Sequence, residues 1–329
     1  MYERPFHSRD LRPFTFLVPG GAGFIGSHLV EYLLRHGAGQ VRVLDNLATG
    51  SIKNLDLFHA NSHLEVWEGD IREGNICRQA CRGVDFVLHQ AALGSVPRSI
   101  EDPVTTNAVN VDGFLNVLVA AKENSVRRLI YAASSSTYGD SEKLPKVEEE
   151  IGRPLSPYAV TKLVNELYAD VFARSYGLET IGLRYFNVFG PRQDPQGAYA
   201  AVIPLLMKAF LKHQSPTIYG DGEQTRDFTF VANVVQANVK ALFADDQAVN
   251  HVYNVAAGDR TSLNQLFTLL QQLAASELTA TYAPDRPGDI RDSLASVEKA
   301  RIRLGYDPQV RIREGLAITW EWFKQEFGG

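Results

Sequence analysis

The chain has 329 residues, enough for one large domain or two joined ones, and 33 Lys and Arg against 38 Asp and Glu give a net charge of −5. This weak acidity argues against nucleic-acid binding as the main task, and no apolar run is long enough to cross a bilayer. Two cysteines cannot form a disulfide framework, and the eight histidines lack metal-ligand spacing. We therefore expect a cytoplasmic protein with no bound metal, no membrane segment and no nucleic-acid partner.

Short apolar runs and amphipathic segments alternate through the first half of the chain. Residues 1–13 carry no signal-peptide pattern and are interpreted as a loose or docking extension. Apolar runs predict strands at residues 14–18, 40–45, 64–70, 84–92, 127–133 and 180–190. Helical periodicity follows the first strand and recurs over about 104–123 and from residue 157 onward. Strand, helix and strand in repeated order predict an α/β fold with a doubly wound parallel sheet that is covered on both faces.

This rhythm changes after Gly190. The second half is predicted to contain a helix over 198–214, a turn-rich segment over 216–228, a strand over 251–256, a helix capped at Thr261 or Ser262, and a mostly helical tail from Ser296. The strand should return to the sheet, so the domains are discontinuous. We expect a sheet domain of residues 14–185 with 227–258, and a smaller mixed C-terminal lobe of 186–226 with 259–329.

The segment VPGGAGFIGS, residues 18–27, places Gly20, Gly23 and Gly26 between a strand and a helix. Glycines there allow a tight turn and a close approach of the backbone to a pyrophosphate at the helix N-terminus. Asp45 ends the second strand, where a carboxylate can bind ribose hydroxyls and repel a 2′-phosphate, and Asn46 adds no positive charge. The pattern predicts NAD rather than NADP; the competing interpretation is a plain turn with a solvated aspartate.

Asp70 and Ile71 close the third strand and could flank the adenine of this cofactor. The alternative is that Asp70 caps a helix that begins within the segment REGNIC. The sequence favours neither interpretation over the other.

The segment SPYAVTK, residues 156–162, places Tyr158 and Lys162 one turn apart on a helix that Ser156 can cap and Pro157 can start. A free tyrosine titrates near pH ~10, but an ammonium and a cationic cofactor would favour the phenolate and make Tyr158 a usable base. Ser134 follows a strand at the carboxyl edge of the sheet, where its hydroxyl can steady a substrate oxygen. Taken singly, each is more often a turn or a helix-surface pair, but their order along the chain favours catalysis.

With these motifs, the chain resembles the extended short-chain dehydrogenase/reductase superfamily, and it is most similar to nucleotide-sugar 4-epimerases of the UDP-N-acetylglucosamine type. The resemblance covers about residues 14–325. The segments that carry it are HQAALGSVPRSI (89–100), YAASSSTYGD (131–140), LSPYAVTKLVNELYADVF (155–172), GLRYFNVFGPRQDPQGAYAAVIP (182–204) and RTSLNQLF (260–267). It implies a Rossmann-type sheet and an NAD that stays bound through the catalytic cycle.

The resemblance implies a cycle of oxidation and reduction at C4 of a UDP-sugar. Tyr158 takes the proton of the 4-hydroxyl, Ser134 holds the same oxygen, and hydride moves to the nicotinamide. The 4-keto sugar then turns about its diphosphate link and receives the hydride on its other face. The expected activity interconverts UDP-GlcNAc and UDP-GalNAc, and also UDP-Glc and UDP-Gal.

Motifs and resemblance together assign the residues around both ligands. The NAD site is expected to comprise Gly20, Gly23, Phe24, Ile25, Gly26, Asp45, Asn46, Asp70, Ile71, Gln90, Ala91, Ala92, Tyr158, Lys162 and Tyr185. The substrate site is expected to comprise Gly94, Ser95, Ser134, Ser135, Ser136, Asn187, Gln193, Ala201, Val202, Tyr219, Arg226, Arg286 and Ser293. A diphosphate prefers forked cationic donors, which suits the two arginines, although single arginines are also common in surface ion pairs.

One position is expected to set the size of the accepted sugar. In the family that the chain resembles, a large side chain there restricts the pocket to plain hexoses, and a small one admits the N-acetyl group. The alignment places Ser293 at this position, and a shift of one residue would place Asp292 or Leu294 there. Serine leaves room for acetamido sugars.

Other functions stay open on the same scaffold. A 4,6-dehydratase would need an Asp-Glu pair after the strand-end serine, where this chain has Ser136, Thr137 and Tyr138. A UDP-uronate 4-epimerase or decarboxylase would be distinguished by its products, and a catalytically silent NAD-sensing scaffold protein would show no turnover. The resemblance further implies a homodimer, in which helices around 104–123 and 157–174 pair with those of a second copy.

Overall fold

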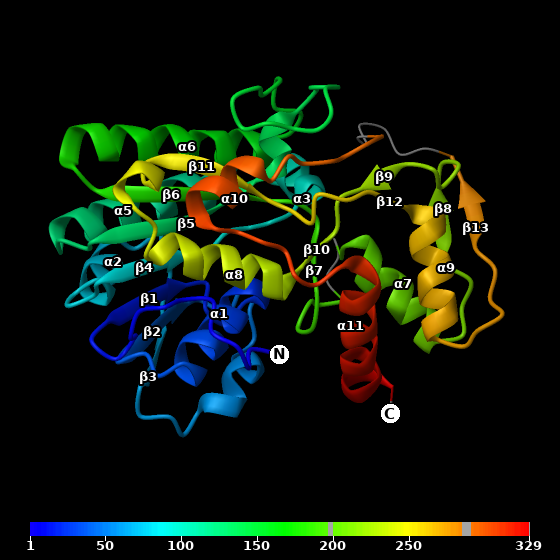
Figure 1. Ribbon diagram of the computed structural model, residues 1–329, viewed down its shortest axis with the longest axis horizontal. Coiled ribbons are helices and arrows are strands. Elements are labelled where there is room, and N and C mark those ends of the chain that lie inside the picture. The colour runs from blue at the N-terminus through cyan, green and yellow to red at the C-terminus, as the bar shows by residue number, and fades with distance from the viewer. Residues whose placement is uncertain (197–199, 285–290, 329) are drawn as a thin grey trace.

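A seven-stranded parallel sheet forms the centre of the computed structural model, which describes residues 1–196, 200–284 and 291–328 (Figure 1). The strands lie in the order β11, β6, β5, β4, β1, β2, β3, so the chain starts inside the sheet and winds toward both edges. Their bounds are β1 Thr15–Pro19, β2 Gln40–Asp45, β3 Leu64–Glu68, β4 Phe86–His89, β5 Arg128–Ser134, β6 Glu179–Tyr185 and β11 His251–Val255. The doubly wound parallel sheet is thereby confirmed, and β11 returns to it beside β6. The boundaries of the two expected domains stay a prediction.

Helices cover both faces of the sheet because its strands are apolar on both sides. The central strand β5, for example, is buried along nearly its whole length. Helices α2, α5 and α6 pack on one face, α1 and α8 pack on the other, and α10 lies beside β11 (Figure 1). Their bounds are α1 Phe24–Arg35, α2 Gly74–Ala80, α5 Gly113–Glu123, α6 Pro157–Tyr176, α8 Val231–Leu242 and α10 Glu298–Leu304.

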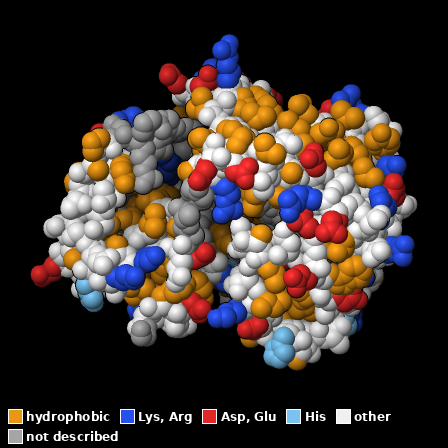
Figure 2. Space-filling view, turned by 180° about the vertical axis from the view of Figure 1, so that it is seen from behind, with side chains coloured by type: hydrophobic (Ala, Val, Ile, Leu, Met, Phe, Trp, Pro, Cys, Tyr) orange, Lys and Arg blue, Asp and Glu red, His pale blue; other side chains and the backbone are white. Residues whose placement is uncertain are grey.

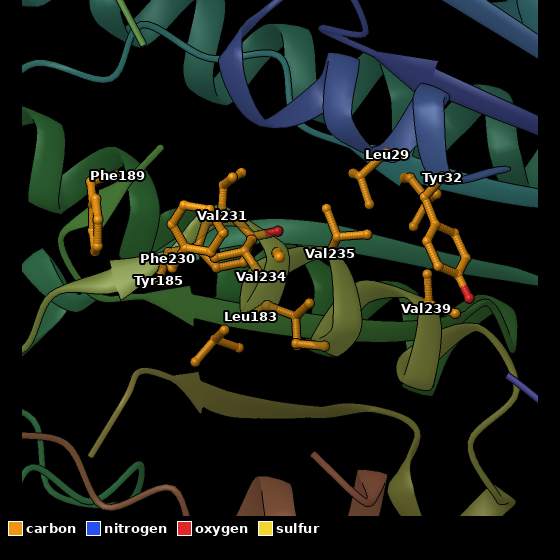
Figure 3. Packing of buried hydrophobic residues seen from close by; sticks show 14 of the residues in the cluster. Leu29, Tyr32, Leu183, Tyr185, Phe189, Phe230, Val231, Val234, Val235 and Val239 are labelled. Atoms are coloured by element: carbon orange, nitrogen blue, oxygen red, sulfur yellow. The ribbon is translucent and has the colours of Figure 1, made fainter. Parts of the chain in front are cut away.

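Helix α8 fixes α1 against the sheet, as Figure 3 shows. Val235 lies between Leu29 of α1 and Leu183 of β6, and Val239 lies beside Tyr32. All five side chains are fully buried, and burying an aliphatic side chain of this size contributes about 1.5–3 kcal/mol. Because α1 directly follows the glycine-rich loop, this packing also sets the position of that loop.

The helical pattern predicted over 104–123 is realised as α4 (Pro103–Asn107), a π-helical turn (Ala108–Asp112) and α5. A π turn of this kind often marks a functional site. Helix α6 begins as predicted, since the Ser156 side chain accepts a hydrogen bond from the Ala159 amide at 3.2 Å and Pro157 is the first helical residue. Short 3₁₀ turns lie at Ile52–Phe58 (η1), Ser135–Tyr138 (η3) and Asp246–Ala248 (η4).

A smaller lobe of helices and two-stranded sheets lies at one end of the molecule (Figure 1). Helices α7, α9 and α11 pack against one another, and β7 pairs with β10, β8 with β13 and β9 with β12. Their bounds are α7 Val202–Leu211, α9 Leu263–Leu273, α11 Ile312–Phe327, β7 Val188–Phe189, β8 Thr217–Tyr219, β9 Thr225–Arg226, β10 Thr229–Phe230, β12 Thr261–Ser262 and β13 Thr281–Ala283. Ser262 caps α9 as predicted, and Gln265 completes a capping box. The segment predicted to be turn-rich holds the two short strands β8 and β9.

Residues 1–13 dock along α1, which decides between the two interpretations of this extension. The Phe6 ring stacks on Tyr32 with ring centroids 5.2 Å apart, and the Phe6 amide donates to the Tyr32 hydroxyl at 2.6 Å. The side chains of Tyr2 and Leu11 are almost completely buried. His36, at the end of α1, donates from Nε2 to the Tyr2 carbonyl at 3.0 Å.

Within the described ranges, no helix combines the length and the apolar composition that a membrane span needs.

Candidate active site

The carboxyl ends of four neighbouring strands bring many of the predicted residues to one edge of the sheet. Strand β1 ends at Pro19, β4 at His89, β5 at Ser134 and β6 at Tyr185. Ser134 and Tyr185 are register partners, and the Ala91 amide donates to the Pro19 carbonyl at 2.9 Å. Open α/β sheets bind ligands beyond this edge. Figure 2 shows a hollow between the sheet domain and the smaller lobe.

Ser134 ends β5 beside Tyr158, where its hydroxyl favours the phenolate form of Tyr158. Its hydroxyl oxygen accepts from the Ser136 amide at 3.1 Å and from the Ser136 hydroxyl at 2.9 Å. With both acceptor positions engaged, the hydroxyl proton of Ser134 remains available for donation to Tyr158 or to a substrate oxygen. Ser135 and Ser136 both lie in the turn η3 that follows Ser134. Lys162 Nζ lies 5.9 Å from the Tyr158 ring centroid. The structure therefore brings the three predicted catalytic residues together.

The pKa values of this pair differ from the direction that the sequence predicts. Burial raises the pKa of Tyr158 above 10.0, and the neighbouring Ser134 hydroxyl opposes this only in part. Lys162 is 2% exposed, and burial lowers the pKa of its ammonium to about 8. Nζ donates to the Ala132 carbonyl at 2.8 Å. For these residues by themselves, the expectation of an acidic phenol is thus corrected, because desolvation by burial dominates the pKa of Tyr158.

The glycine-rich loop fits a pyrophosphate by its shape and by the helix that it starts. At Gly20, φ is +79° and a Cβ would collide with the backbone that follows β4. At Gly26, a Cβ would collide with the Gly20 carbonyl oxygen. Gly23 is the N-cap of α1; no side chain caps this helix, and its first turn, from Phe24 and Ile25 onward, has no acidic residue. The uncapped N–H groups therefore suit the phosphates of a dinucleotide.

Asp45 fastens the glycine-rich loop in addition to its predicted role. Its Oδ2 accepts from the Ala22 amide and its Oδ1 from the Leu47 amide, both at 2.9 Å. A carboxylate offers about four acceptor positions, so Asp45 keeps capacity for ribose hydroxyls. The Asn46 side chain donates to Asp70 Oδ2 at 2.8 Å. These neutral and acidic groups fit NAD and would repel a 2′-phosphate.

Asp70 does not cap the following helix, because the N-cap of α2 is Glu73. It accepts instead from the Arg72 amide at 2.8 Å and from the Arg72 guanidinium at 2.7 Å. This pairing with Arg72 lowers the pKa of Asp70 to about 2. Ile71 is buried in the core beside Gly113. The cap interpretation is thus wrong, and contact of Asp70 and Ile71 with adenine stays a prediction.

Gln90 and Tyr185 meet in a hydrogen-bonded group with Asn238 of α8, which sequence reasoning missed. The Tyr185 hydroxyl donates to Gln90 Oε1 at 3.1 Å and accepts from Asn238 Nδ2 at 2.8 Å. Gln90 Nε2 donates to Asn238 Oδ1 at 3.3 Å. Burial raises the pKa of Tyr185 to about 12, so this hydroxyl stays protonated. The group fixes the Gln90 side chain directly before Ala91 and Ala92, whose contact with NAD stays a prediction.

Asn110, in the π-helical turn, is a second positioning residue that sequence reasoning missed. Its Oδ1 accepts from the Leu93 amide at 2.8 Å, and its Nδ2 donates to the Leu93 carbonyl and to Thr161 Oγ1, both at 3.2 Å. Thr161 precedes Lys162 on α6. Asn110 therefore ties the loop with Gly94 and Ser95 to the helix that carries Tyr158 and Lys162.

Three predicted substrate residues lie around β9. Asn187 Nδ2 donates to the Asp227 carbonyl at 3.1 Å. Arg226 directly precedes Asp227, and its Nη1 donates to the Thr225 carbonyl at 2.9 Å. The Ser293 amide donates to the same Thr225 carbonyl at 3.1 Å. These contacts place Asn187, Arg226 and Ser293 in one cluster.

Asp227 organises this cluster, and its position directly after Arg226 could have indicated it. Its carboxylate is completely buried and accepts from the amides of Ala257 at 2.9 Å, Gly258 at 3.1 Å and Ala295 at 3.2 Å. Burial raises its pKa to about 7, and these amide donors oppose the rise. Asp227 thus holds three separate segments of the chain together beside Arg226.

The other predicted substrate residues lie elsewhere in the lobe. Gln193 donates to the Val188 carbonyl at 3.1 Å, and Tyr219 ends β8. Ala201 is the N-cap of α7, and Val202 is its first residue. Arg286 lies outside the described residues. Contact of each with a substrate stays a prediction.

A cavity of about 940 Å³ lies at the opposite, amino edge of the sheet. Its lining does not suit the proton transfer predicted for Tyr158. The cavity is lined by Phe86, Arg128 and Glu179, at the starts of β4, β5 and β6. The Arg128 guanidinium is fully engaged by Glu179 at 2.8 Å and by three backbone carbonyls. The carboxyl edge, with Ser134 and Tyr158, therefore remains the candidate site.

Comparisons with known proteins agree with this geometry. Residues 16–256 match the model of the NAD dependent epimerase/dehydratase family. The chain is 38% identical to a putative UDP-glucose 4-epimerase of Methanocaldococcus jannaschii over 310 residues, which cover 94% of this chain and 98% of that protein.

Solved structures of similar proteins also match nearly the whole chain. UDP-glucose 4-epimerase of Thermotoga maritima, solved with UDP-glucose, superposes with a TM-score of 0.89 at 37% identity, and the match covers 94% of this chain and 99% of that one. UDP-N-acetylglucosamine 4-epimerase of Methanobrevibacter ruminantium M1, solved with UDP-N-acetylmuramic acid, gives a TM-score of 0.90 at 39% identity, with 95% and 99% covered.

Proposed function

This chain belongs to the NAD dependent epimerase/dehydratase family, and from that premise we propose that it is a UDP-hexose 4-epimerase that interconverts UDP-GlcNAc and UDP-GalNAc, and also UDP-Glc and UDP-Gal. The observation that carries the proposal is that Ser134, Tyr158 and Lys162 come together at the carboxyl edge of the sheet, with Lys162 Nζ 5.9 Å from the Tyr158 ring centroid. The names of the similar proteins, which include both UDP-glucose and UDP-N-acetylglucosamine 4-epimerases, support the same substrate class.

Each of the three residues has a distinct task in this reaction. The Tyr158 phenolate takes the proton of the sugar 4-hydroxyl, becomes a phenol, and later returns the proton. The Ser134 hydroxyl holds the same sugar oxygen, and the Lys162 ammonium stabilises the negative charge of the phenolate. Bound NAD supplies the hydride acceptor and donor for C4. The uncapped N-terminus of α1 and Asp45 are the groups that would hold this cofactor.

The diphosphate of the substrate is assigned to the lobe. Arg226 offers a guanidinium beside Asn187, and Asp227 holds the surrounding backbone in place. Arg286 is proposed as the second cation. A planar guanidinium binds two phosphate oxygens at once, which suits a group that must stay fixed while the sugar turns.

A 4,6-dehydratase is the poorer interpretation because the residues after Ser134 are engaged in holding the fold. Thr137 Oγ1 donates to the Ser134 carbonyl at 2.8 Å, and the Tyr138 hydroxyl donates to Asn254 Oδ1 at 2.7 Å. Neither position carries a carboxylate. A UDP-uronate 4-epimerase or decarboxylase uses the same catalytic pair, so only its products distinguish it.

The test is turnover of separate UDP-sugars without added NAD. We expect the purified protein to convert UDP-GlcNAc and UDP-Glc to their 4-epimers, and Tyr158→Phe to lower the rate by about 100- to 10,000-fold, the range of a lost general base. Product separation by chromatography measures both, and circular dichroism checks the fold. Tyr168→Phe, on the same helix, is the matched control and should keep the rate. Turnover of UDP-glucuronate alone, or a normal rate for Tyr158→Phe, would contradict the proposal.

The protein is also proposed to act as a homodimer in the cytoplasm. Helix α6 has a buried face with Lys162 and Glu166 and a second, exposed apolar stripe that includes Val160, Leu167 and Val171. An exposed apolar stripe next to the active site supports pairing of this helix with a second copy.

A further inference from the structure

Burial disfavours the charged form of Lys162, on which the proposed role of this residue depends. The ammonium is almost completely buried, and its one hydrogen bond in the described structure goes to the Ala132 carbonyl at 2.8 Å. Burial lowers the pKa of Lys162 to about 8, whereas it raises the pKa of Tyr158. A neutral amine could not stabilise a phenolate. A neighbouring negative charge therefore extends the pH range over which Lys162 stays protonated.

Glu166 provides that charge one turn further along α6. Lys162 and Glu166 are both on the buried face of the helix, where residues four apart are neighbours. Glu166 cannot turn away, because both its oxygens accept from Arg184 of β6, at 2.9 Å from Nε and at 2.8 Å from Nη2. The Glu166 charge acts against the fall in the pKa of Lys162.

A second set of contacts holds Arg184 in this position. Its Nη1 donates to the Glu148 carbonyl at 3.0 Å, and its guanidinium carbon lies 4.9 Å from the Tyr138 ring centroid. The Tyr138 hydroxyl in turn donates to Asn254 of β11, whose amide donates to Glu148 Oε1 at 2.8 Å. Helix α6, strands β6 and β11 and the turn after β5 are thus joined behind the catalytic pair.

The remaining ionisable groups near these residues are neutral or paired elsewhere. His89 at the end of β4 faces Lys162, and burial lowers its pKa to about 3. Tyr131 of β5 faces Glu166, and burial raises its pKa well above 10.0. Asp170 forms an exposed ion pair with Arg174 at 2.5 Å. Glu166 is therefore the buried carboxylate that faces Lys162 from its own helix.

We propose that Glu166, held by Arg184, is a positioning residue of the active site whose buried carboxylate keeps the Lys162 ammonium charged. Without this carboxylate, Lys162 loses its proton at a lower pH. Tyr158 then lacks its cationic neighbour over part of the range in which the enzyme works. The rate of catalysis should therefore fall first at the alkaline end of the pH profile. This inference rests on the proposed epimerase activity for its kinetic readout but not for its spectroscopic one.

The kinetic test compares the pH profiles of kcat for UDP-Glc from about pH 6 to about pH 10, a range that spans the lysine titration. In Glu166→Gln, the midpoint of the alkaline limb should shift to lower pH by about one unit or more, the usual effect of losing an opposite charge on a neighbouring side chain. The fall in rate at the alkaline end is then about tenfold. Glu166→Asp keeps a carboxylate and should restore part of the profile. Asp170→Asn, one turn further along the same helix, is the matched control and should leave the limb unchanged.

A second readout follows Lys162 itself in the protein as purified. Carbon-13 NMR of Cε-labelled lysine reports the protonation of each amine, and the Lys162 resonance is assigned by its loss in Lys162→Met. Its titration midpoint should fall in Glu166→Gln by the same amount as the kinetic limb and stay in place in Asp170→Asn. If the wild-type chain turns over no UDP-sugar, the proposed function fails, but this titration still tests the role of Glu166.

A further variant covers the risk that Glu166→Gln fails to fold, since it leaves the buried guanidinium without its partner. Glu166→Gln combined with Arg184→Met removes both charges and keeps similar side-chain lengths. Because the Arg184 charge by itself lowers the pKa of Lys162, the double variant is compared with Arg184→Met alone, and the proposal requires a lower midpoint in the double variant than in that single variant. Equal midpoints and alkaline limbs in these two folded variants would overturn it, because Glu166 would then have only a structural role.

Discussion

At the scale of single residues, Ser293 is the proposed determinant of the size of the accepted sugar. Its amide is fixed by the Thr225 carbonyl at 3.1 Å, and the preceding Asp292 is engaged by the Thr225 hydroxyl at 2.6 Å. Successive side chains of an extended segment point to opposite sides. Ser293 is therefore directed away from the side on which Asp292 meets Thr225. This favours Ser293 over Asp292 as the residue that sets the size of the pocket.

We expect Ser293→Tyr to remove turnover of acetamido sugars selectively. The phenol would occupy the space that the N-acetyl group needs, while a plain hexose would still fit. The value of kcat/KM for UDP-GlcNAc should fall by about 10- to 200-fold relative to that for UDP-Glc, the range that pocket shape commonly supplies. Ser293→Ala is the control and should keep both activities. Equal loss for both sugars in Ser293→Tyr would show that the residue does not select between them.

The proximity of the proposed catalytic residues could be predicted from the sequence, but the balance of their charges could not. Tyr158 and Lys162 are one helical turn apart, so their proximity follows from spacing alone. Their pKa values depend on burial, which in turn depends on what covers α6 and β5. The contact of Glu166 with Arg184 joins residues 18 positions apart through two separate elements. Pattern in the sequence gives no measure of such desolvation.

At the scale of elements, α6 has one buried face and, on its other side, an exposed apolar stripe. Lys162, Glu166 and Ala169 lie on its buried side. On the other side, Val160, Leu167 and Val171 are exposed and recur at helical spacing. A helix with apolar residues on both sides is expected to be covered on both. The proposed dimer would cover the exposed stripe and steady the helix that carries Tyr158.

Leu167→Glu should therefore weaken the dimer strongly. Leu167 is 59% exposed, so a charge there is harmless to the single chain, but two copies of it would be buried at a symmetric interface. A cost of about 3 kcal/mol corresponds to about a 100-fold rise in Kd. Light scattering after gel filtration measures the change in mass. Ile302→Glu on α10, where the side chain is 70% exposed, is the control and should leave the mass unchanged. A monomeric wild-type chain, or an unaffected dimer, would contradict the prediction.

Elements were easier to predict than their local irregularities. The strands at 40–45 and 251–256, the start of α6 at Pro157 and the Ser262 cap follow from apolar runs and capping residues. The π-helical turn at Ala108–Asp112 does not, because Asn110 is drawn into it by contacts with Leu93 and Thr161 from other parts of the chain.

At the scale of the whole molecule, residues 1–13 help to join α1 of the sheet domain to residues 191–192, which lead into the lobe. His28 of α1 lies against Tyr2, with ring centroids 6.0 Å apart, and its Nε2 donates to the Pro191 carbonyl at 2.9 Å. Burial lowers the pKa of His28 to about 3, so the ring stays neutral. Glu31, one turn further, pairs with Arg192 at 2.5 Å. Helix α1 thus connects the extension on one side with residues 191–192 on the other, a link that no local pattern in the sequence predicts.

Deleting residues 1–13 should lower the free energy of unfolding by about 2–4 kcal/mol. Tyr2 and Leu11 are buried, and each contributes about 1.5–3 kcal/mol, against which the chain regains the entropy of an ordered segment. Urea unfolding followed by tryptophan fluorescence measures the loss. Tyr2→Phe is the matched control: the Tyr2 hydroxyl is buried and has no hydrogen-bond partner in the described part of the chain, so its removal should be neutral or stabilising. An unchanged midpoint after the deletion would mean that α1 and the 191–192 segment hold together without the extension. A large loss in Tyr2→Phe would instead mean that the hydroxyl, and not the packing of the ring, makes the contribution.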